Sequence, residues 1–402
     1  MCDRHDCEHD IDTGRRGFLL DALAAGGLAA LLSTLPGLAG AADDEVVRIG
    51  YLPITDATPL LVAHALGYFE EEGLKIEPPT LIRGWSPLVE GFAAGKFNLV
   101  HLLKPIPVWM RYNNGFPVKI MAWAHVNGSA IVVGKHTNAK SFQDLAGMQV
   151  AVPYWYSVHN VLVQMAIREA GLKPVIKGQG EPLAKDEVNL LIMPPPDMPP
   201  ALAAKKIDAF TVAEPFNAAG EVLAGAKMLR FTGDIWKNHP CCVICMNEHQ
   251  VKARPAWTQK VMNALVKAEI HAQANKAAVA EMLSRDGEGY LPMPADVVKR
   301  AMTLYDTAIY AEPAAIKHAD WGTGRIDFSP YPYPSATRAL VEAMTRTLVG
   351  GDRTFLDKLD PAFVAGDLVD DRFVKQAMAK HGGWKLPSMR HADHEREELI
   401  RL

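Results

Sequence analysis

The chain has 402 residues, in which 42 lysines and arginines face 46 aspartates and glutamates. This near balance excludes the strongly basic surface of a nucleic-acid-binding protein, so we expect no nucleic-acid partner. Hydrophobic residues make up 49% and charged residues 22% of the chain, which is typical of a soluble globular protein. The length predicts a large core divided between more than one lobe.

Residues 1–41 have the pattern of a twin-arginine export signal. The pair Arg15-Arg16 precedes an apolar run at 22–32. That run is too short to cross a bilayer, since a spanning helix takes about 20 residues. Ala39-Gly40-Ala41 is the small-x-small pattern that signal peptidase recognises. We therefore expect recognition by the twin-arginine translocase, cleavage near Ala41 and a periplasmic mature chain.

Short β-rich runs alternate with helical stretches from Val46 onward. VVRIGYL (46–52) and FNLVHLL (97–103) are predicted strands, and the alternation restarts after Lys135 with MQVAVP (148–153). Repeated β-α-β units predict largely parallel sheets with helices on their faces. Two such units predict an α/β protein of two lobes.

The predicted lobes are crossed twice by the chain. Because ligands of open parallel sheets bind outside the carboxyl ends of strands, two facing lobes predict a ligand cleft and a two-strand hinge. The expected division is 1–41 signal peptide, 42–133 first part of lobe I, 134–241 lobe II, 242–380 return strand and C-terminal helices of lobe I, and 381–402 a polar, flexible tail.

GYLPITDATPLLVAHALGYFEEEGL (50–74) resembles the opening of the nitrate, bicarbonate and sulfonate solute-binding proteins of ABC importers. Further motifs follow in the order of that family: Trp85, HLLKPIPVWM, NGSAI, VHN, MPPPDM, AEPFN, GDIWKNHP and RIDFSPYPYPS. The resemblance covers 46–335. It implies a type II periplasmic-binding-protein fold, a small-molecule solute, a permease partner in the inner membrane, no catalysis and no cofactor.

The resemblance also implies a set of ligand-contacting positions. Relatives hold nitrate with a Trp, a Gln, a His, a Gly and a Lys. Trp85 and His159 match, whereas Ser129 stands in place of the Gln, Ala213 of the Gly and Cys242 of the Lys. Because a neutral thiol cannot supply the positive charge of lysine, we expect a solute other than nitrate.

Two acidic residues have alternative roles. Glu214 lies at a strand-to-helix turn, where it would either accept a hydrogen bond from a ligand or cap its helix at the positive end of the dipole. Asp56 lies in the first strand–helix loop. There an Asx-type turn is favoured over a role in the cleft wall.

Three cysteines lie within HPCCVICMN (239–247), while Cys2 and Cys7 fall in the signal. If 241–246 form the returning strand, alternate residues face opposite sides. Cys241 and Cys245 are then predicted to be buried packing residues. A soft-metal site of Cys242 with His159 and Met246 is the alternative interpretation.

Two other functions remain open at this point. A metal- or metallophore-binding periplasmic protein would use Cys242 and His159. A thiamine-pyrimidine-synthase-like enzyme is also conceivable, because CCVIC (241–245) resembles the Cys-rich stretch of those enzymes. The apparent export signal favours the binding protein.

Overall fold

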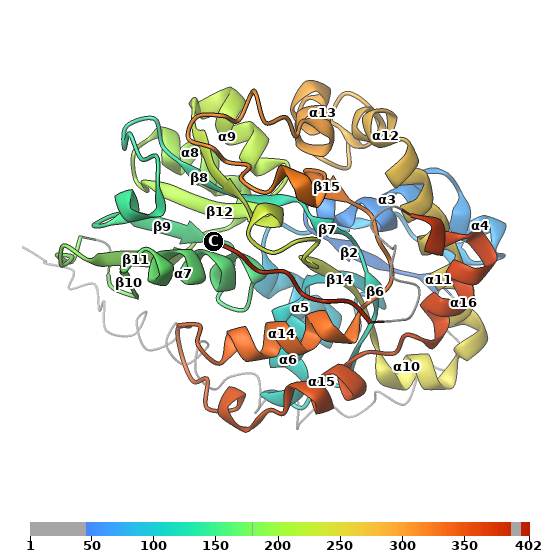
Figure 1. Ribbon diagram of the computed structural model, residues 1–402. Helices are drawn as coiled ribbons and strands as arrows, with labels where there is room; N and C mark the ends of the chain where they lie inside the picture. Colours follow the sequence, from blue (N-terminus) through green and yellow to red (C-terminus); the bar gives the residue numbers. More distant parts are fainter. Residues whose placement is uncertain (1–45, 179, 387–394) are drawn as a thin grey trace, which may run out of the picture.

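The computed structural model describes residues 46–178, 180–386 and 395–402, and it contains two α/β lobes, each with its own sheet (Figure 1). The predicted fold class is confirmed. The expected export signal at 1–41 lies outside the described residues, as do Cys2 and Cys7. Among the helices of the described ranges, none combines the length and the apolar character needed to cross a membrane.

The first lobe is built on a five-stranded sheet with the order β4-β2-β5-β14-β6. β14 runs antiparallel to both of its neighbours, because it returns from the second lobe; Cys242 pairs with Leu103 and Ile244 with Ala122. Its strands are β2 (Ile49–Tyr51), β4 (Thr80–Leu81), β5 (Leu99–Leu103), β6 (Val118–Trp123) and β14 (Cys242–Asn247).

The second lobe is built on a six-stranded sheet with the order β10-β11-β9-β12-β8-β13. β8 is antiparallel to β12 and β13, whereas the other pairs are parallel. Its strands are β8 (Ser129–Val133), β9 (Gln149–Val152), β10 (Lys173–Val175), β11 (Glu187–Ile192), β12 (Ala209–Ala213) and β13 (Lys227–Phe231). Two short ribbons pair β1 (Val46–Val47) with β3 (Lys75–Ile76) and β7 (Val126–Asn127) with β15 (Ile326–Asp327).

Helices flank both sheets, and the C-terminal ones reach both lobes, since α13 packs on α9 and α14 on α7 (Figure 1). The helices are α3 (Thr58–Ala65), α4 (Tyr68–Glu71), α5 (Trp85–Ala93), α6 (Pro105–Tyr112), α7 (Val158–Glu169), α8 (Met198–Ala203), α9 (Phe216–Ala224), α10 (Glu248–Ala253), α11 (Pro255–Ala274), α12 (Lys276–Leu283), α13 (Ala295–Thr303), α14 (Pro334–Met344), α15 (Pro361–Leu368) and α16 (Arg372–His381).

The structure corrects the first predicted lobe boundary. The sequence analysis assigned 42–133 to lobe I, but β8 pairs along its whole length with β12, from Ser129 opposite Ala213 to Val133 opposite Ala209. The chain therefore enters the second sheet at Ser129. The turn at Asn127 and Gly128 makes this early crossing possible, because both residues have positive φ values, 62° and 76°.

The described parts of 381–402, expected to be a polar, flexible tail, make defined contacts. Residues 383–385 form a 3-10 turn after α16, and the last residues pack against the segment between the lobes. Glu398 accepts a hydrogen bond from Trp236 Nε1 at 2.7 Å and pairs with Arg396, which lies over the ring of Trp123. Ile400 bridges to Trp236. Hydrogen bonds, an ion pair and contacts with the Trp123 and Trp236 side chains therefore hold this polar segment.

Glu398→Ala is expected to lower the free energy of unfolding by about 1–3 kcal/mol, because Trp236 Nε1 and the Arg396 guanidinium lose a buried partner. Glu397→Ala is the matched control, since Glu397 is exposed. Urea unfolding of the two variants measures the difference. Equal losses would show that the tail is not docked through Glu398.

A buried ion pair holds the end of β12 to the segment before β15. Arg325 Nε donates to Glu214 Oε1 at 2.7 Å, and both side chains are fully buried. The other carboxylate oxygen of Glu214 accepts from the amide of Ala218 in the first turn of α9. Arg325 also reaches Glu221 and the hydroxyl of Tyr310.

Glu214→Gln is expected to lower the free energy of unfolding by about 3–5 kcal/mol, because the buried guanidinium loses its main countercharge. The control is Arg83→Ala. It removes an exposed pair with Asp197 at 3.5 Å, and such a pair is worth at most about 1 kcal/mol. Thermal and urea unfolding compare the two. A loss for Glu214→Gln as small as the control's would contradict the assignment of this pair.

Candidate functional site

Polar side chains are buried together where the two sheets meet. They come from the turn after β2, the turn after β6, the start of β8, the first turn of α7 and the start of β14. Each is at most 1% exposed. We call this set the junction cluster, and its members are Asp56, His125, Ser129, His159, Cys241 and Cys242.

Local sequence places the two residues from the strand ends. Asp56 lies in a single 3-10 turn, Thr55–Ala57, between β2 and α3. His125 follows β6 and packs on Gly128, where an added Cβ would lie 3.1 Å from the imidazole ring. Glycine is therefore needed at 128 both for its positive φ and for the close approach of the His125 ring.

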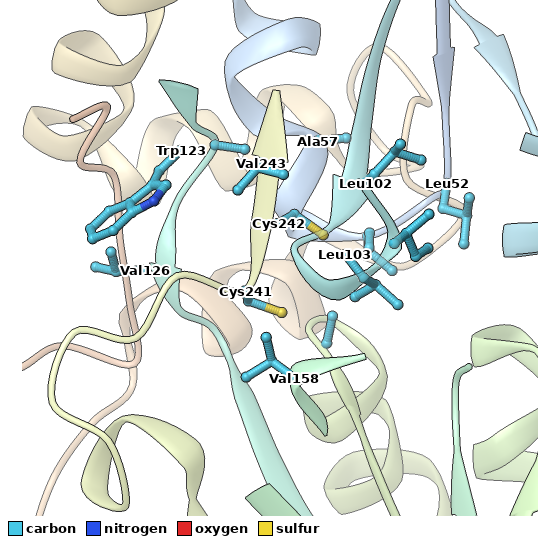
Figure 2. Close-up of a cluster of buried hydrophobic side chains, with 14 of the residues drawn as sticks. Leu52, Ala57, Leu102, Leu103, Trp123, Val126, Val158, Cys241, Cys242 and Val243 are labelled. Atoms are coloured by element: carbon cyan, nitrogen blue, oxygen red, sulfur yellow. The ribbon is translucent and has the colours of Figure 1, made fainter. Parts of the chain in front are cut away.

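The first lobe and its return strand supply four side chains that can bind a metal ion or exchange a proton. Asp56 Oδ2 lies 2.9 Å from His125 Nε2, and the amide of Cys242 approaches the same nitrogen at 3.3 Å. One ligand atom from each of Asp56, His125, Cys241 and Cys242 lies within 4.8 Å of all the others. Figure 2 shows the sulfur atoms of Cys241 and Cys242 on the same side of the chain, surrounded by apolar side chains.

The second lobe supplies Ser129 and His159. His159 Nε2 lies 2.8 Å from Ser129 Oγ and 3.8 Å from Cys241 Sγ. Ser157 caps α7 by accepting a hydrogen bond from the amide of Asn160, which fixes the first turn that carries His159. The structure thus brings two predicted ligand-binding residues together. Their sulfur neighbour is Cys241 rather than Cys242.

Burial and mutual contact set the charges in the cluster. Burial raises the pKa of a thiol, but hydrogen bonding with Cys242 and the adjacent His159 and His125 hold the pKa of Cys241 well below its ordinary value. Burial, Cys241 and Asp56 together raise the pKa of Cys242 well above the ordinary value. Burial opposes charge on His125, yet Asp56 and Cys241 raise its pKa to about 10. Contacts within the cluster therefore shift the pKa values of Cys241 and Cys242 in opposite directions.

Trp85 begins α5 and lies edge-on to His101 of β5, with ring centroids 5.7 Å apart. His101 Nε2 accepts from the amide of Leu52, whereas Trp85 Nε1 has no hydrogen-bond partner among the described residues. Ala213 ends β12 directly opposite Ser129. Ala213 therefore adjoins the junction cluster through Ser129, whereas Trp85 lies against His101 of the first sheet.

Two other predicted residues have different surroundings. Both carboxylate oxygens of Glu214 are engaged, by Arg325 and by the amide of Ala218, so its contacts are those of the helix cap and not of a free ligand acceptor. Met246 pairs with Lys119 at the opposite end of β14 from Cys242. The alternative interpretation, a soft-metal site of Cys242 with His159 and Met246, is not supported by this arrangement.

Sequence reasoning missed three members of the cluster. It assigned Asp56 to a turn and Cys241 to packing, and it did not single out His125. β14 begins at Cys242, so the alternation of a pleated strand does not extend back to Cys241. The proline directly before Cys241 could have shown that Cys241 lies where the strand begins and not inside it, because proline is found at the first residue of a strand and not within a central one.

Comparison with known proteins places this geometry in a family. The model of the NMT1-like family matches residues 40–284. The nitrate/nitrite binding protein NrtA of Nostoc sp. strain PCC 7120 is 24% identical over 313 residues, which cover 72% of this chain and 67% of the relative. The nitrate import ATP-binding protein NrtC of Synechocystis sp. is 27% identical over 230 residues, 55% of this chain but only 34% of that longer relative.

A solved structure shows the same fold. The crystal structure of the periplasmic nitrate-binding protein NrtA from Synechocystis PCC 6803 superposes with a TM-score of 0.72 at 18% identity. The match covers 89% of this chain and 94% of that structure. The two-lobed architecture described above is therefore that of a periplasmic binding protein.

Proposed function

The chain belongs to the NMT1-like family, and from this premise we propose that it is the periplasmic solute-binding component of an ABC importer. Its partners are then a small-molecule solute, a permease in the inner membrane and, during export, the twin-arginine translocase. The observation that carries the proposal is the junction cluster. Buried polar side chains from both lobes meet at the place where a two-lobed binding protein closes on its solute.

The solute contacts we propose are Trp85, Ser129 and His159, with Ala213 and Cys242 lining the site. Trp85 supplies a flat apolar surface and an N–H donor that no described residue pairs with. Ser129 and His159 supply a hydroxyl and an imidazole from the second lobe. Closure of the lobes would then bring one face of the solute against each lobe.

The charge of the site favours a solute other than nitrate. None of the hydrogen bonds or ion pairs that the described residues make to the junction cluster comes from a lysine or arginine side chain. A small anion bound without such a partner loses most of its hydration and gains little in return. A charge-neutral or metal-associated solute suits these side chains better.

Trp85→Ala and His159→Ala are each expected to abolish retention of the solute that co-purifies from the periplasm, because each removes a direct contact. Native mass spectrometry of protein isolated from its own periplasm measures the retained mass. His271→Ala is the matched control, since His271 lies on α11 and contacts Tyr68. Solute retention unchanged in both site variants, with circular dichroism unchanged, would remove these residues from the site.

A second expectation concerns nitrate itself. Added nitrate is expected to leave the melting temperature unchanged, whereas a bound solute raises it with concentration. Differential scanning fluorimetry of the solute-free protein checks this. A saturable rise with nitrate would contradict the argument from the missing lysine.

A further inference from the structure

We propose that Asp56, His125, Cys241 and Cys242 form a binding site for one divalent metal ion of the zinc class. The inference goes beyond solute binding, because all four residues belong to the first lobe and its return strand and do not depend on which solute is carried.

The spacing of the four side chains fits a tetrahedral ion. With metal–sulfur bonds of about 2.3 Å and metal–nitrogen or metal–oxygen bonds of about 2.0 Å, ligand atoms lie about 3.3–3.8 Å from one another. The ligand atoms of the four residues already lie within 4.8 Å of one another. Small side-chain rotations therefore suffice to close them on an ion.

The hydrogen-bonding pattern is incomplete without a cation. His125 Nε2 faces both the Asp56 carboxylate and the amide N–H of Cys242. One nitrogen cannot donate to the first while accepting from the second. Both oxygens of Asp56 lack a properly directed hydrogen bond from any described residue, although the side chain is fully buried. His125 Nε2 lies 2.9 Å from Asp56 Oδ2, but a buried carboxylate with so few directed hydrogen bonds is costly, and a bound cation would complete its coordination.

The donor set selects the class of metal. Two sulfurs exclude calcium and magnesium, which take oxygen ligands. The imidazole and carboxylate beside them suit a borderline divalent ion that accepts four ligands, the preference of Zn²⁺. Both cysteines bind as thiolates and His125 binds as the neutral imidazole, and the protons that these three groups still carry pass to solvent as the bonds to the metal form.

The second lobe covers the site without completing it. Ser129 Oγ and His159 Nε2 lie 3.7 and 3.8 Å from Cys241 Sγ. When the lobes move apart, these two residues leave the sulfur uncovered, and an ion can enter. His159 is therefore a neighbour of the ligand set and not a member of it.

Cobalt titration tests the site, because tetrahedral Co²⁺ bound to thiolates absorbs strongly in the visible range. We expect one Co²⁺ per chain, displaced by one Zn²⁺. Cys242→Ser, Cys241→Ser and His125→Ala should each weaken Co²⁺ binding at least about 100-fold, since loss of outer-shell partners alone costs about 10–100-fold. Cys245→Ser is the matched control, because Cys245 is buried on the same strand but lies outside the four ligands.

His159→Ala separates this proposal from the solute site. It should keep the cobalt spectrum while losing the periplasmic solute, and Cys242→Ser should lose the spectrum with an unchanged circular dichroism spectrum. An unchanged cobalt spectrum in Cys242→Ser, a spectrum lost equally in Cys245→Ser, or cobalt binding only when the solute is present would overturn the metal site.

Discussion

The start of β14 must be buried between two sheets, and this constraint shapes the whole lobe junction. β14 completes the first sheet between β5 and β6, so Cys242 is held opposite Leu103 with no access to water. Polar groups that meet there have to satisfy one another. Ser129 and His159 do so through a contact of 2.8 Å, whereas neither oxygen of Asp56 receives a directed hydrogen bond from a described residue. The positions of these side chains follow from where β2, β8 and α7 begin or end.

Burial of the start of β14 also connects the two-lobed architecture with the proposed solute binding. Each sheet contains a strand that has crossed from the other lobe, β8 in one and β14 in the other, and both are antiparallel to their neighbours. The crossings lie beside the junction cluster, so a change in the angle between the lobes acts directly on contacts such as His159 with Cys241. A ligand bound at this place would favour the closed arrangement of the lobes, because it would make contacts there that are lost when the lobes move apart.

Much of the fold could be predicted from the sequence, because strands and helices leave different periodic patterns of apolar residues. The two lobes and the returning strand were predictable for that reason. The entry into the second sheet at Ser129 was not, since the turn at Asn127 and Gly128 carries no hydrophobic pattern. Trp85, Ser129 and His159 were predicted as solute contacts through a family resemblance, but the contact of His159 with Cys241 and the position of His125 are tertiary facts. Asp56 does lie in a turn and Cys241 is buried, as predicted, but their proximity to His125 and Cys242 is a tertiary fact that neither local pattern reports.

X-ray absorption at the zinc edge tests the central claim, that the buried cluster at the start of β14 is a ligand site. For the zinc-loaded protein the account predicts four ligands, two of them sulfur at about 2.3 Å and two nitrogen or oxygen at about 2.0 Å. Cys245→Ser should leave that shell unchanged. A shell of nitrogen and oxygen alone, or a single sulfur, would contradict it.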